Sequence, residues 1–255
     1  MCFSLKREED PMLKIAHRGY SGLLKGKVEN TILSFERALW AGADAIELDV
    51  RRTRDRELVV VHDMSLQRVA GVSVKVSELT YEQILQYDVG LGHHAYVPRL
   101  EFILAHFYTS GCRFLIELKQ SGIAQDLPGM FQFFSSRGME LKNRVMISAF
   151  DHDDRSEDST SSWEDLLKAW PLNIALAATY YPKISRMGWE PFLKTAVSMG
   201  AIAVTPCNGV TKTIVDMAHE LGIMVYPWTV NNPKGIRNMK NCGVDGIISD
   251  FPNLL

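Results

Sequence analysis

The chain has 255 residues, of which 46% are hydrophobic and 23% are charged. This length and composition suit one large α/β domain and exclude a disordered, collagen-like or repeat-array chain. Its 28 basic and 30 acidic residues leave a formal net charge of −2, so no global positive field draws it to nucleic acid or to an anionic membrane. Any phosphate group must therefore be bound by a local set of residues.

The cysteines and apolar segments bear on where the protein works. Its 4 cysteines are scattered without a CxxC pair, which predicts neither a zinc site nor a disulfide framework. The first residues lack the apolar run of a secretory signal, and no apolar stretch is long enough for a transmembrane helix. We therefore expect a cytoplasmic protein. Met12 directly precedes the first predicted strand, so residues 1–11 are expected to form a flexible extension.

Short apolar runs rich in β-branched residues recur along the chain, and helical spacing follows each of them. They lie at residues 13–17, 45–50, 114–119, 145–150, 174–179, 202–206, 223–230 and 246–249. Strands that alternate with helices indicate parallel βαβ units. Eight such units in a chain of this length predict a (β/α)8 TIM barrel, formed by a single domain over residues 12–255.

A ninth apolar run, at residues 57–62, follows the second strand after only a few residues. A parallel neighbour would need a crossover of about a dozen residues, so this run is the return arm of a β-hairpin. It is followed by a predicted small insertion at residues 63–98.

Helices are expected after Asn30 and Thr31, which would cap the first one, and at residues 77–87 and 100–108. Residues 151–162 contain no large apolar side chain, and we expect a flexible loop there.

Charged residues interrupt the aliphatic pattern of two predicted barrel strands. Residues two apart in a strand share a face, so Glu47 lies with Asp49, and Glu117 with Lys119. The alternate aliphatic residues pack against helices, which directs the charges into the barrel near its catalytic end. A single carboxylate could simply pair with Lys119 or an arginine. Three together would repel one another unless a hard divalent cation lay between them, and oxygen ligands favour Mg²⁺, Ca²⁺ or Mn²⁺ over zinc.

Two histidines end segments that lead to the same region. His17 ends the first strand, just before Arg18 and Gly19, and His62 ends the hairpin arm. A lone histidine at a strand end is often structural, but two that converge on carboxylates suit a general base and a general acid. Arg18 offers a planar fork for phosphate, and Gly19 permits close backbone approach. Together these residues predict hydrolysis of a phosphate ester. The other histidines are expected at the surface or in packing: His93, His94, His106, His152 and His219.

With these residues the chain resembles the glycerophosphodiester phosphodiesterase family. The matching motifs follow the family's order over residues 13–255. They are His17-Arg18-Gly19, Glu29-Asn30-Thr31, Gly42-Ala43-Asp44 leading to Glu47-Leu48-Asp49-Val50, His62-Asp63, Glu117-Leu118-Lys119, Trp228-Thr229-Val230-Asn231 and Gly243-Val244-Asp245-Gly246-Ile247-Ile248-Ser249-Asp250. The resemblance implies metal ligation by Glu47, Asp49 and Glu117, and acid–base roles for His17 and His62.

The resemblance also assigns residues around this centre. It implies phosphate contacts from Arg18 and Lys119, and an apolar wall from Trp228 for the glycerol or the leaving alcohol; Trp228 could otherwise be a core residue. Glu29 would support the site from behind the residues that touch substrate. Arg99 departs from the family pattern after the insertion, where it could alter the rim that faces the alcohol.

We therefore expect metal-dependent hydrolysis of a glycerophosphodiester to sn-glycerol 3-phosphate and an alcohol, with His17 as base and His62 as acid. The attacking oxygen is either water or the substrate's own glycerol 2-hydroxyl. The partner is a small-molecule substrate rather than nucleic acid; neither the alcohol nor the oligomeric state follows from the sequence.

Two alternatives belong to other classes. A lysophospholipase D-like phosphodiesterase would need an apolar rim for an acyl chain, and insertion residues could supply one: Tyr87, Val89, Leu91, Tyr96 and Val97. A non-catalytic binding protein would have no use for the intact acid–base and metal-ligand set.

Overall fold

A computed structural model describes residues 11–22, 28–90, 92–150, 173–177, 188–207 and 209–255. The expected loop at 151–162 and the expected extension, apart from Pro11, lie outside these residues, as does His152. Within the described part of the chain, no helix is long and apolar enough to cross a membrane.

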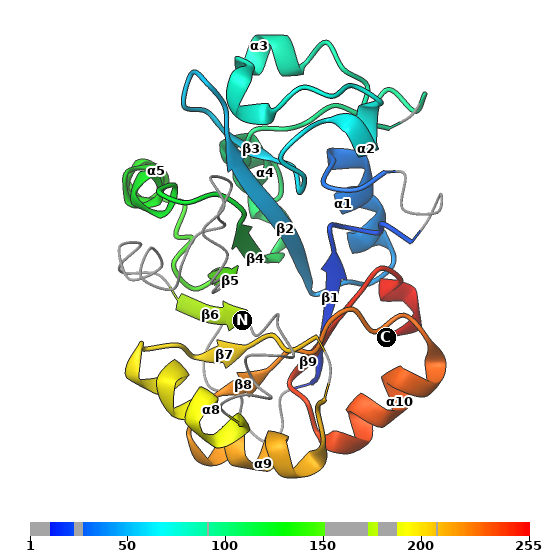
Figure 1. The fold of residues 1–255 in the computed structure, drawn as a ribbon, viewed down its shortest axis with the longest axis vertical. Helices are drawn as coiled ribbons and strands as arrows, with labels where there is room; N and C mark the ends of the chain where they lie inside the picture. The colour runs from blue at the N-terminus through cyan, green and yellow to red at the C-terminus, as the bar shows by residue number, and fades with distance from the viewer. Residues whose placement is uncertain (1–10, 23–27, 91, 151–172, 178–187, 208) are drawn as a thin grey trace.

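Eight strands of the sheet are parallel, in the order β8-β7-β6-β5-β4-β2-β1-β9. Their bounds are β1 (Leu13–His17), β2 (Ala45–Arg52), β4 (Arg113–Leu118), β5 (Val145–Phe150), β6 (Asn173–Ala177), β7 (Ala203–Val204), β8 (Met224–Val225) and β9 (Gly246–Ser249). Backbone hydrogen bonds close the ring between its first and last members: Asp245 N–H donates to Val225 O at 3.1 Å, and Ile248 N–H to Pro227 O at 3.0 Å. The predicted barrel is confirmed (Figure 1).

The hairpin is confirmed as well. Strand β3 (Leu58–Val60) pairs antiparallel with β2, with Val60 opposite Val50 and Leu58 opposite Arg52. After this arm, Val61 N–H donates to Asp49 O at 2.9 Å. The hairpin therefore returns His62 to the level of the β2 carboxylates.

The long helices lie outside the strands (Figure 1). They are α1 (Ile32–Trp40), α4 (Leu100–His106), α5 (Leu127–Ser135), α8 (Trp189–Ser198), α9 (Lys212–Glu220) and α10 (Pro233–Cys242). Single 3₁₀ turns lie at Tyr108–Ser110, Ala124–Asp126 and Pro252–Leu254. Helix α1 begins as expected after Thr31, whose hydroxyl accepts from Ser34 N–H in a capping box.

One predicted helix is wrong. Residues 77–87 do not form a continuous helix: a 3₁₀ turn at Val76–Glu78 is followed by α3 (Tyr81–Ile84). Leu79 between them is extended, and Thr80 starts the second helix because its side chain accepts from Gln83 N–H. The capping preference of Thr80 thus overrides the helical spacing of the apolar residues around it.

The apolar core has two layers separated by the barrel wall. Outward-facing strand residues such as Ile46, Leu48 and Ile116 pack against helices. Inward-facing residues such as Leu115 and Tyr226 fill the barrel interior. The expected alternation along these strands is therefore correct. The interior layer forms an apolar floor inside the barrel.

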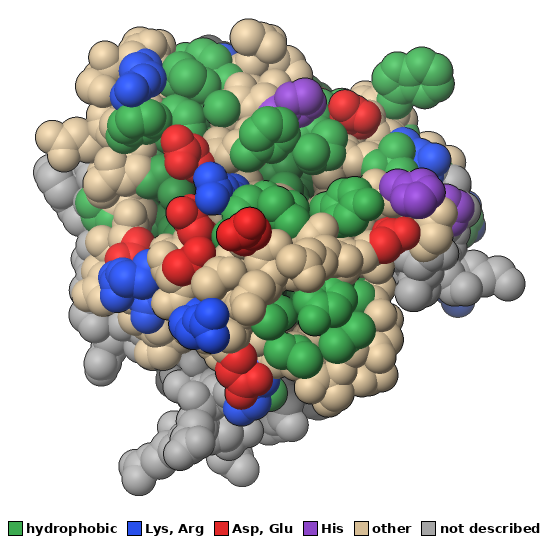
Figure 2. Space-filling view, turned by 90° about the horizontal axis from the view of Figure 1, so that it is seen from above, with side chains coloured by type: hydrophobic (Ala, Val, Ile, Leu, Met, Phe, Trp, Pro, Cys, Tyr) green, Lys and Arg blue, Asp and Glu red, His purple; other side chains and the backbone are tan. Residues whose placement is uncertain are grey.

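The segment between β3 and α4 has a small apolar cluster of its own. Val69 of α2 (Gln67–Ala70), Val76 and Ile84 pack there with Val59 and Val61 of the hairpin arm. The boundaries of the domain and of its insertion stay a prediction. Seen from the α3 side, the described surface mixes acidic and basic side chains instead of gathering one sign (Figure 2).

Candidate active site

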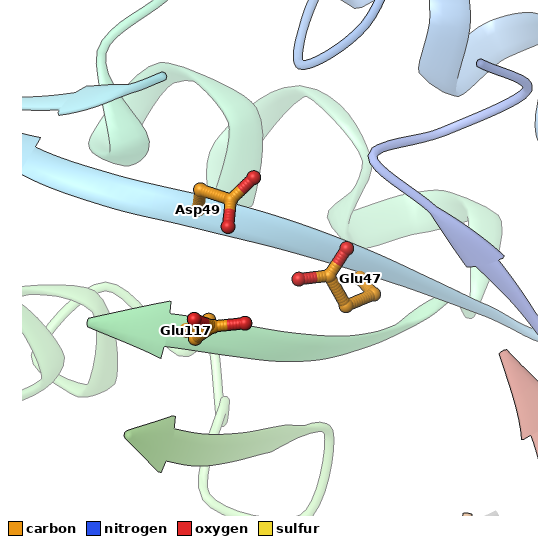
Figure 3. A group of neighbouring side chains, drawn as sticks. All are labelled: Glu47, Asp49 and Glu117. Carbon is orange, nitrogen blue, oxygen red and sulfur yellow. The ribbon is translucent and has the colours of Figure 1, made fainter. Parts of the chain in front are cut away.

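Three carboxylates converge inside the barrel. Glu47 and Asp49 extend from β2, and Glu117 extends from the neighbouring β4, where it lies in register with Asp49 (Figure 3). Each side chain offers an oxygen within 4.8 Å of those of the others. The residues are only 4%, 1% and 9% exposed, respectively. The strand period of two thus brings together the three acids that the sequence assigned to a metal.

Two cationic side chains, those of Lys119 and Arg18, lie beside the three carboxylates. Lys119 Nζ contacts Glu117 and lies 3.3 Å from Asp49, so the ion pair considered from the sequence is present. Burial alone would raise the pKa of Asp49, but the positive charges of Lys119 and Arg18 outweigh this effect, so the pKa of Asp49 is lowered. Burial raises the pKa of Glu47, and the negative charges of Asp49 and Glu117 add to this.

The pKa of Glu117 is also raised, by burial first and in spite of Lys119. Burial therefore disfavours the ionised form of two of the three acids, and a divalent cation would stabilise that form. Buried carboxylate oxygens without imidazole or thiolate among them are the donors that Mg²⁺, Ca²⁺ and Mn²⁺ prefer. The donor set fits a hard cation.

Arg18 reaches this cluster through an unusual turn. Arg18 and Gly19 both have left-handed backbone conformations, with φ of 55° and 82°. The turn directs Arg18 N–H to Glu47 Oε2 at 2.9 Å. The Arg18 guanidinium lies 3.2 Å from Asp49 and donates to Glu29 Oε1 at 3.0 Å. One residue thus contacts the metal-ligand candidates with its backbone and with its side chain.

The two histidines have matching partners. His17 Nδ1 lies 2.6 Å from Asp250 Oδ1, and His62 Nδ1 lies 2.7 Å from Asp63 Oδ1. Because a carboxylate only accepts, we assign the Nδ1 proton to each ring, which leaves Nε2 to face a substrate. Burial lowers the pKa of His62, and Asp63 opposes this only in part. Four of the remaining histidines are exposed, as expected: His93, His94, His106 and His219.

Several residues that hold the site were not assigned roles from the sequence. Asn30 was expected only to help cap α1, but its Nδ2 donates to Asp49 Oδ2 at 2.8 Å. Asp250 is fixed in turn by Ser21 Oγ at 2.9 Å and by Asn231. Asn30 and Asp250 lie within the motifs quoted above, next to Glu29 and near the end of β9, and these positions could have indicated their roles. Arg68, which donates to Glu29 and Asp63, lies in no such motif, so nothing in the sequence indicated its role.

Trp228 lies beside the first histidine. Its ring centroid is 6.4 Å from that of His17, and its Nε1–H donates to Thr205 O at 2.6 Å. The side chain is half-buried and also packs against the interior apolar layer. Its place is compatible with an apolar wall, and that role stays a prediction.

The residues considered for an apolar rim belong to the segment between β3 and α4. Val89 and Val97 are buried in the insertion's own cluster, and Tyr87 packs against it. Tyr96 is exposed, and position 91 lies outside the described residues. Arg99 pairs with Glu57 at 3.3 Å and lies over the ring of Tyr81, so it joins the hairpin to the insertion.

Comparison with known proteins gives a consistent result. The model of the glycerophosphoryl diester phosphodiesterase family matches residues 17–254. A glycerophosphodiester phosphodiesterase of Bacillus altitudinis is 33% identical over 252 residues, which cover 95% of this chain and 96% of the relative. A solved structure from Silicibacter pomeroyi is 28% identical with a TM-score of 0.79, covering 96% of this chain and 92% of that one.

A more distant structure agrees in fold. An Oleispira antarctica phosphodiesterase, solved in complex with the product sn-glycerol-3-phosphate, has a TM-score of 0.75 at 19% identity. The match covers 95% of this chain and 94% of that one.

Proposed function

Because this chain belongs to the glycerophosphoryl diester phosphodiesterase family, we propose that it hydrolyses glycerophosphodiesters to sn-glycerol 3-phosphate and an alcohol with the help of a divalent cation. Membership makes it a phosphoric diester hydrolase. The product named in the Oleispira antarctica complex supports the choice of sn-glycerol 3-phosphate.

One observation carries the cation's part in this proposal. Three buried carboxylates each offer an oxygen within 4.8 Å of those of the others. Beside them lie two imidazoles, each of which has one nitrogen bound to a carboxylate and the other left for substrate. Glu47, Asp49 and Glu117 would hold the ion. When bound, Mg²⁺, Ca²⁺ or Mn²⁺ would neutralise phosphoryl charge and lower the pKa of the attacking oxygen.

The protein's own residues supply binding and proton transfer. Arg18 and Lys119 bind the phosphate oxygens, and the Arg18 fork orients them. His17 Nε2 takes the proton of the attacking oxygen, and His62 Nε2 gives one to the departing alkoxide. Burial favours neutral His62 in the free enzyme, so the negative phosphate must raise the pKa of His62 when it binds. Trp228 walls the glycerol or alcohol side.

Chelation tests the metal role. Protein stripped with EDTA should lose the release of choline and glycerol 3-phosphate from glycerophosphocholine, and Mg²⁺, Ca²⁺ or Mn²⁺ should restore it. Glu47→Gln should abolish the restoration because a ligand is missing, whereas Glu36→Gln, on the exposed face of α1, should not. Full activity in the stripped protein would contradict a metal-dependent reaction.

The same assay tests the leaving group. The described residues suggested for an acyl chain do not form a continuous apolar rim, because Val89 and Val97 are buried in the insertion and Tyr87 packs against their cluster. We therefore expect glycerophosphocholine to be turned over faster than lysophosphatidylcholine. The reverse order would favour lysophospholipase D activity.

A further inference from the structure

Arg68 joins the insertion to the candidate site. It lies on the short helix α2, and its guanidinium makes three contacts with carboxylate oxygens. Nη1 and Nη2 donate to Glu29 Oε2 and Oε1, each at 2.7 Å, and Nε donates to Asp63 Oδ2 at 2.6 Å. Two edges of one planar group are thus used on two different carboxylates, which a lysine ammonium cannot reproduce.

Each of these carboxylates leads to a residue of the proposed reaction. Glu29 Oε1 also accepts from Arg18 at 3.0 Å, and Asp63 Oδ1 contacts His62 Nδ1 at 2.7 Å. Arg68 therefore stands behind the phosphate-binding arginine on one side and behind the acid–base histidine on the other.

The backbone that carries Arg68 is held independently of these contacts. Its neighbour Val69 is buried in the apolar cluster with Val59 and Val61 of the hairpin arm, whereas the Arg68 side chain is 45% exposed. Loss of the guanidinium should therefore leave α2 in place. What is lost is the fixed distance between the Glu29 and Asp63 carboxylates.

We propose that Arg68 is a positioning residue that fixes Arg18 and His62 relative to each other, through Glu29 and Asp63. This inference rests on the proposed function, because it concerns the residues of that reaction. Removal of Arg68 leaves Asp63 with one partner fewer, so the His62 ring can turn. It also leaves Glu29 held only by Arg18 among the described residues, so the Arg18 fork can shift with Glu29.

The kinetic test compares Arg68→Met and Arg68→Lys on two substrates. With glycerophosphocholine, kcat should fall about 10- to 100-fold in both variants, the usual cost of losing an outer partner of a reacting group. With a 4-nitrophenyl ester of glycerol phosphate, kcat should fall less, because this leaving group scarcely needs a proton from His62. KM should rise for both substrates as Arg18 loosens. Lysine should not rescue, since it lacks the fork.

Two further variants sharpen this test. Arg54→Met is the matched control: Arg54 is an exposed arginine with one side-chain hydrogen bond to Gln83, and it should keep wild-type kinetics. If Arg68 acts through Asp63, the double variant Arg68→Met with Asp63→Asn should lose less than the product of the two single losses.

A spectroscopic measurement separates this inference from the proposed function. In protein with ¹⁵N-labelled histidine, Arg68→Met should shift the ring nitrogen signals of His62 and leave those of His17 in place. If the wild type turns over no glycerophosphodiester, the proposed function fails and this spectrum still decides the positioning role. Turnover by Arg68→Met with wild-type kinetics and an unchanged His62 spectrum would overturn the inference. Equal losses on both substrates with rescue by lysine would also overturn it.

Discussion

At the residue scale, the two histidines share one arrangement but differ in how it is supported. Asp250, which holds His17, is itself held by Ser21 and Asn231 from the barrel. Asp63, which holds His62, is held by a side chain of the insertion. Among the described residues, the contacts that orient His17 thus come from the barrel, whereas those that orient His62 include a contact with the insertion.

The first prediction separates the roles of these residues. If His62 protonates the leaving group, His62→Ala should lower kcat on glycerophosphocholine by roughly 10²- to 10⁴-fold while substrate binding survives. On a nitrophenyl diester the loss should be much smaller. Steady-state kinetics on both substrates measure the difference.

Glu47→Ala is the comparison for this prediction. It removes a metal ligand and should depress both substrates alike, because charge at the phosphoryl group must be stabilised whatever departs. Equal losses for His62→Ala on both substrates would reject its role as leaving-group acid. Dependence on the leaving group in His17→Ala alone would exchange the roles of the two histidines.

The sequence could predict this site only in part. Glu47, Asp49 and Glu117 were predictable because a strand repeats every two residues and neighbouring parallel strands lie in register. Other residues of the site come from loops and from the insertion. Asn30 lies 19 residues from Asp49, and Arg68 lies 39 residues from Glu29. No periodicity connects such positions, so only the folded chain brings them together.

At the element scale, the turn after β1 controls how Arg18 enters the site. Gly19 has φ of 82°, and a Cβ there would lie 2.6 Å from Ser34 Oγ and 2.7 Å from the Ser34 backbone carbon. Ser34 belongs to α1 and cannot retreat, because its hydroxyl donates to Arg18 O or Thr31 O. The turn and the helix are therefore packed against each other at this glycine.

The second prediction concerns Gly19→Ala. We expect it to lower the free energy of unfolding by more than the roughly 1–2 kcal/mol that a left-handed non-glycine residue costs. It should also lower kcat/KM, because the turn carries Arg18. Gly42→Ala is the matched control, since Gly42 has φ of 85° and no atom within 4 Å of a Cβ. Urea unfolding and kinetics measure both effects; equal costs for the two variants would show that the contact with Ser34 is unimportant.

The elements differ in how well the sequence predicts them. The strands are short runs rich in aliphatic residues that alternate with helical segments, so all eight and the hairpin arm were found. The helical pattern at 77–87 predicted one continuous helix wrongly, because the insertion is small and its apolar residues pack in a local cluster. There a single threonine cap decides where a helix begins.

At the scale of the whole molecule, barrel closure depends on Asp245. Its backbone N–H donates to Val225 O, and its carbonyl accepts from Leu13 N–H at 2.8 Å. Its carboxylate accepts from Val225 N–H at 2.7 Å and lies 2.9 Å from His219 Nε2. One residue thus joins β8, β9, β1 and α9, at the end of the barrel opposite the candidate site.

The third prediction follows from this closure. Asp245→Ala leaves the buried Val225 N–H without its carboxylate acceptor, and such a loss costs about 1–3 kcal/mol of unfolding free energy. Asp245→Asn keeps an acceptor oxygen and should cost less, while Asp216→Ala, which breaks an exposed ion pair with Lys212, should cost under about 1 kcal/mol. Urea unfolding measures all three. The value of kcat/KM per folded molecule should stay at the wild-type level, because Asp245 precedes β9, whereas the proposed catalytic residues His17 and His62 lie at the carboxyl end of β1 and after β3. A stable Asp245→Ala protein with impaired catalysis would contradict this division between closure and catalysis.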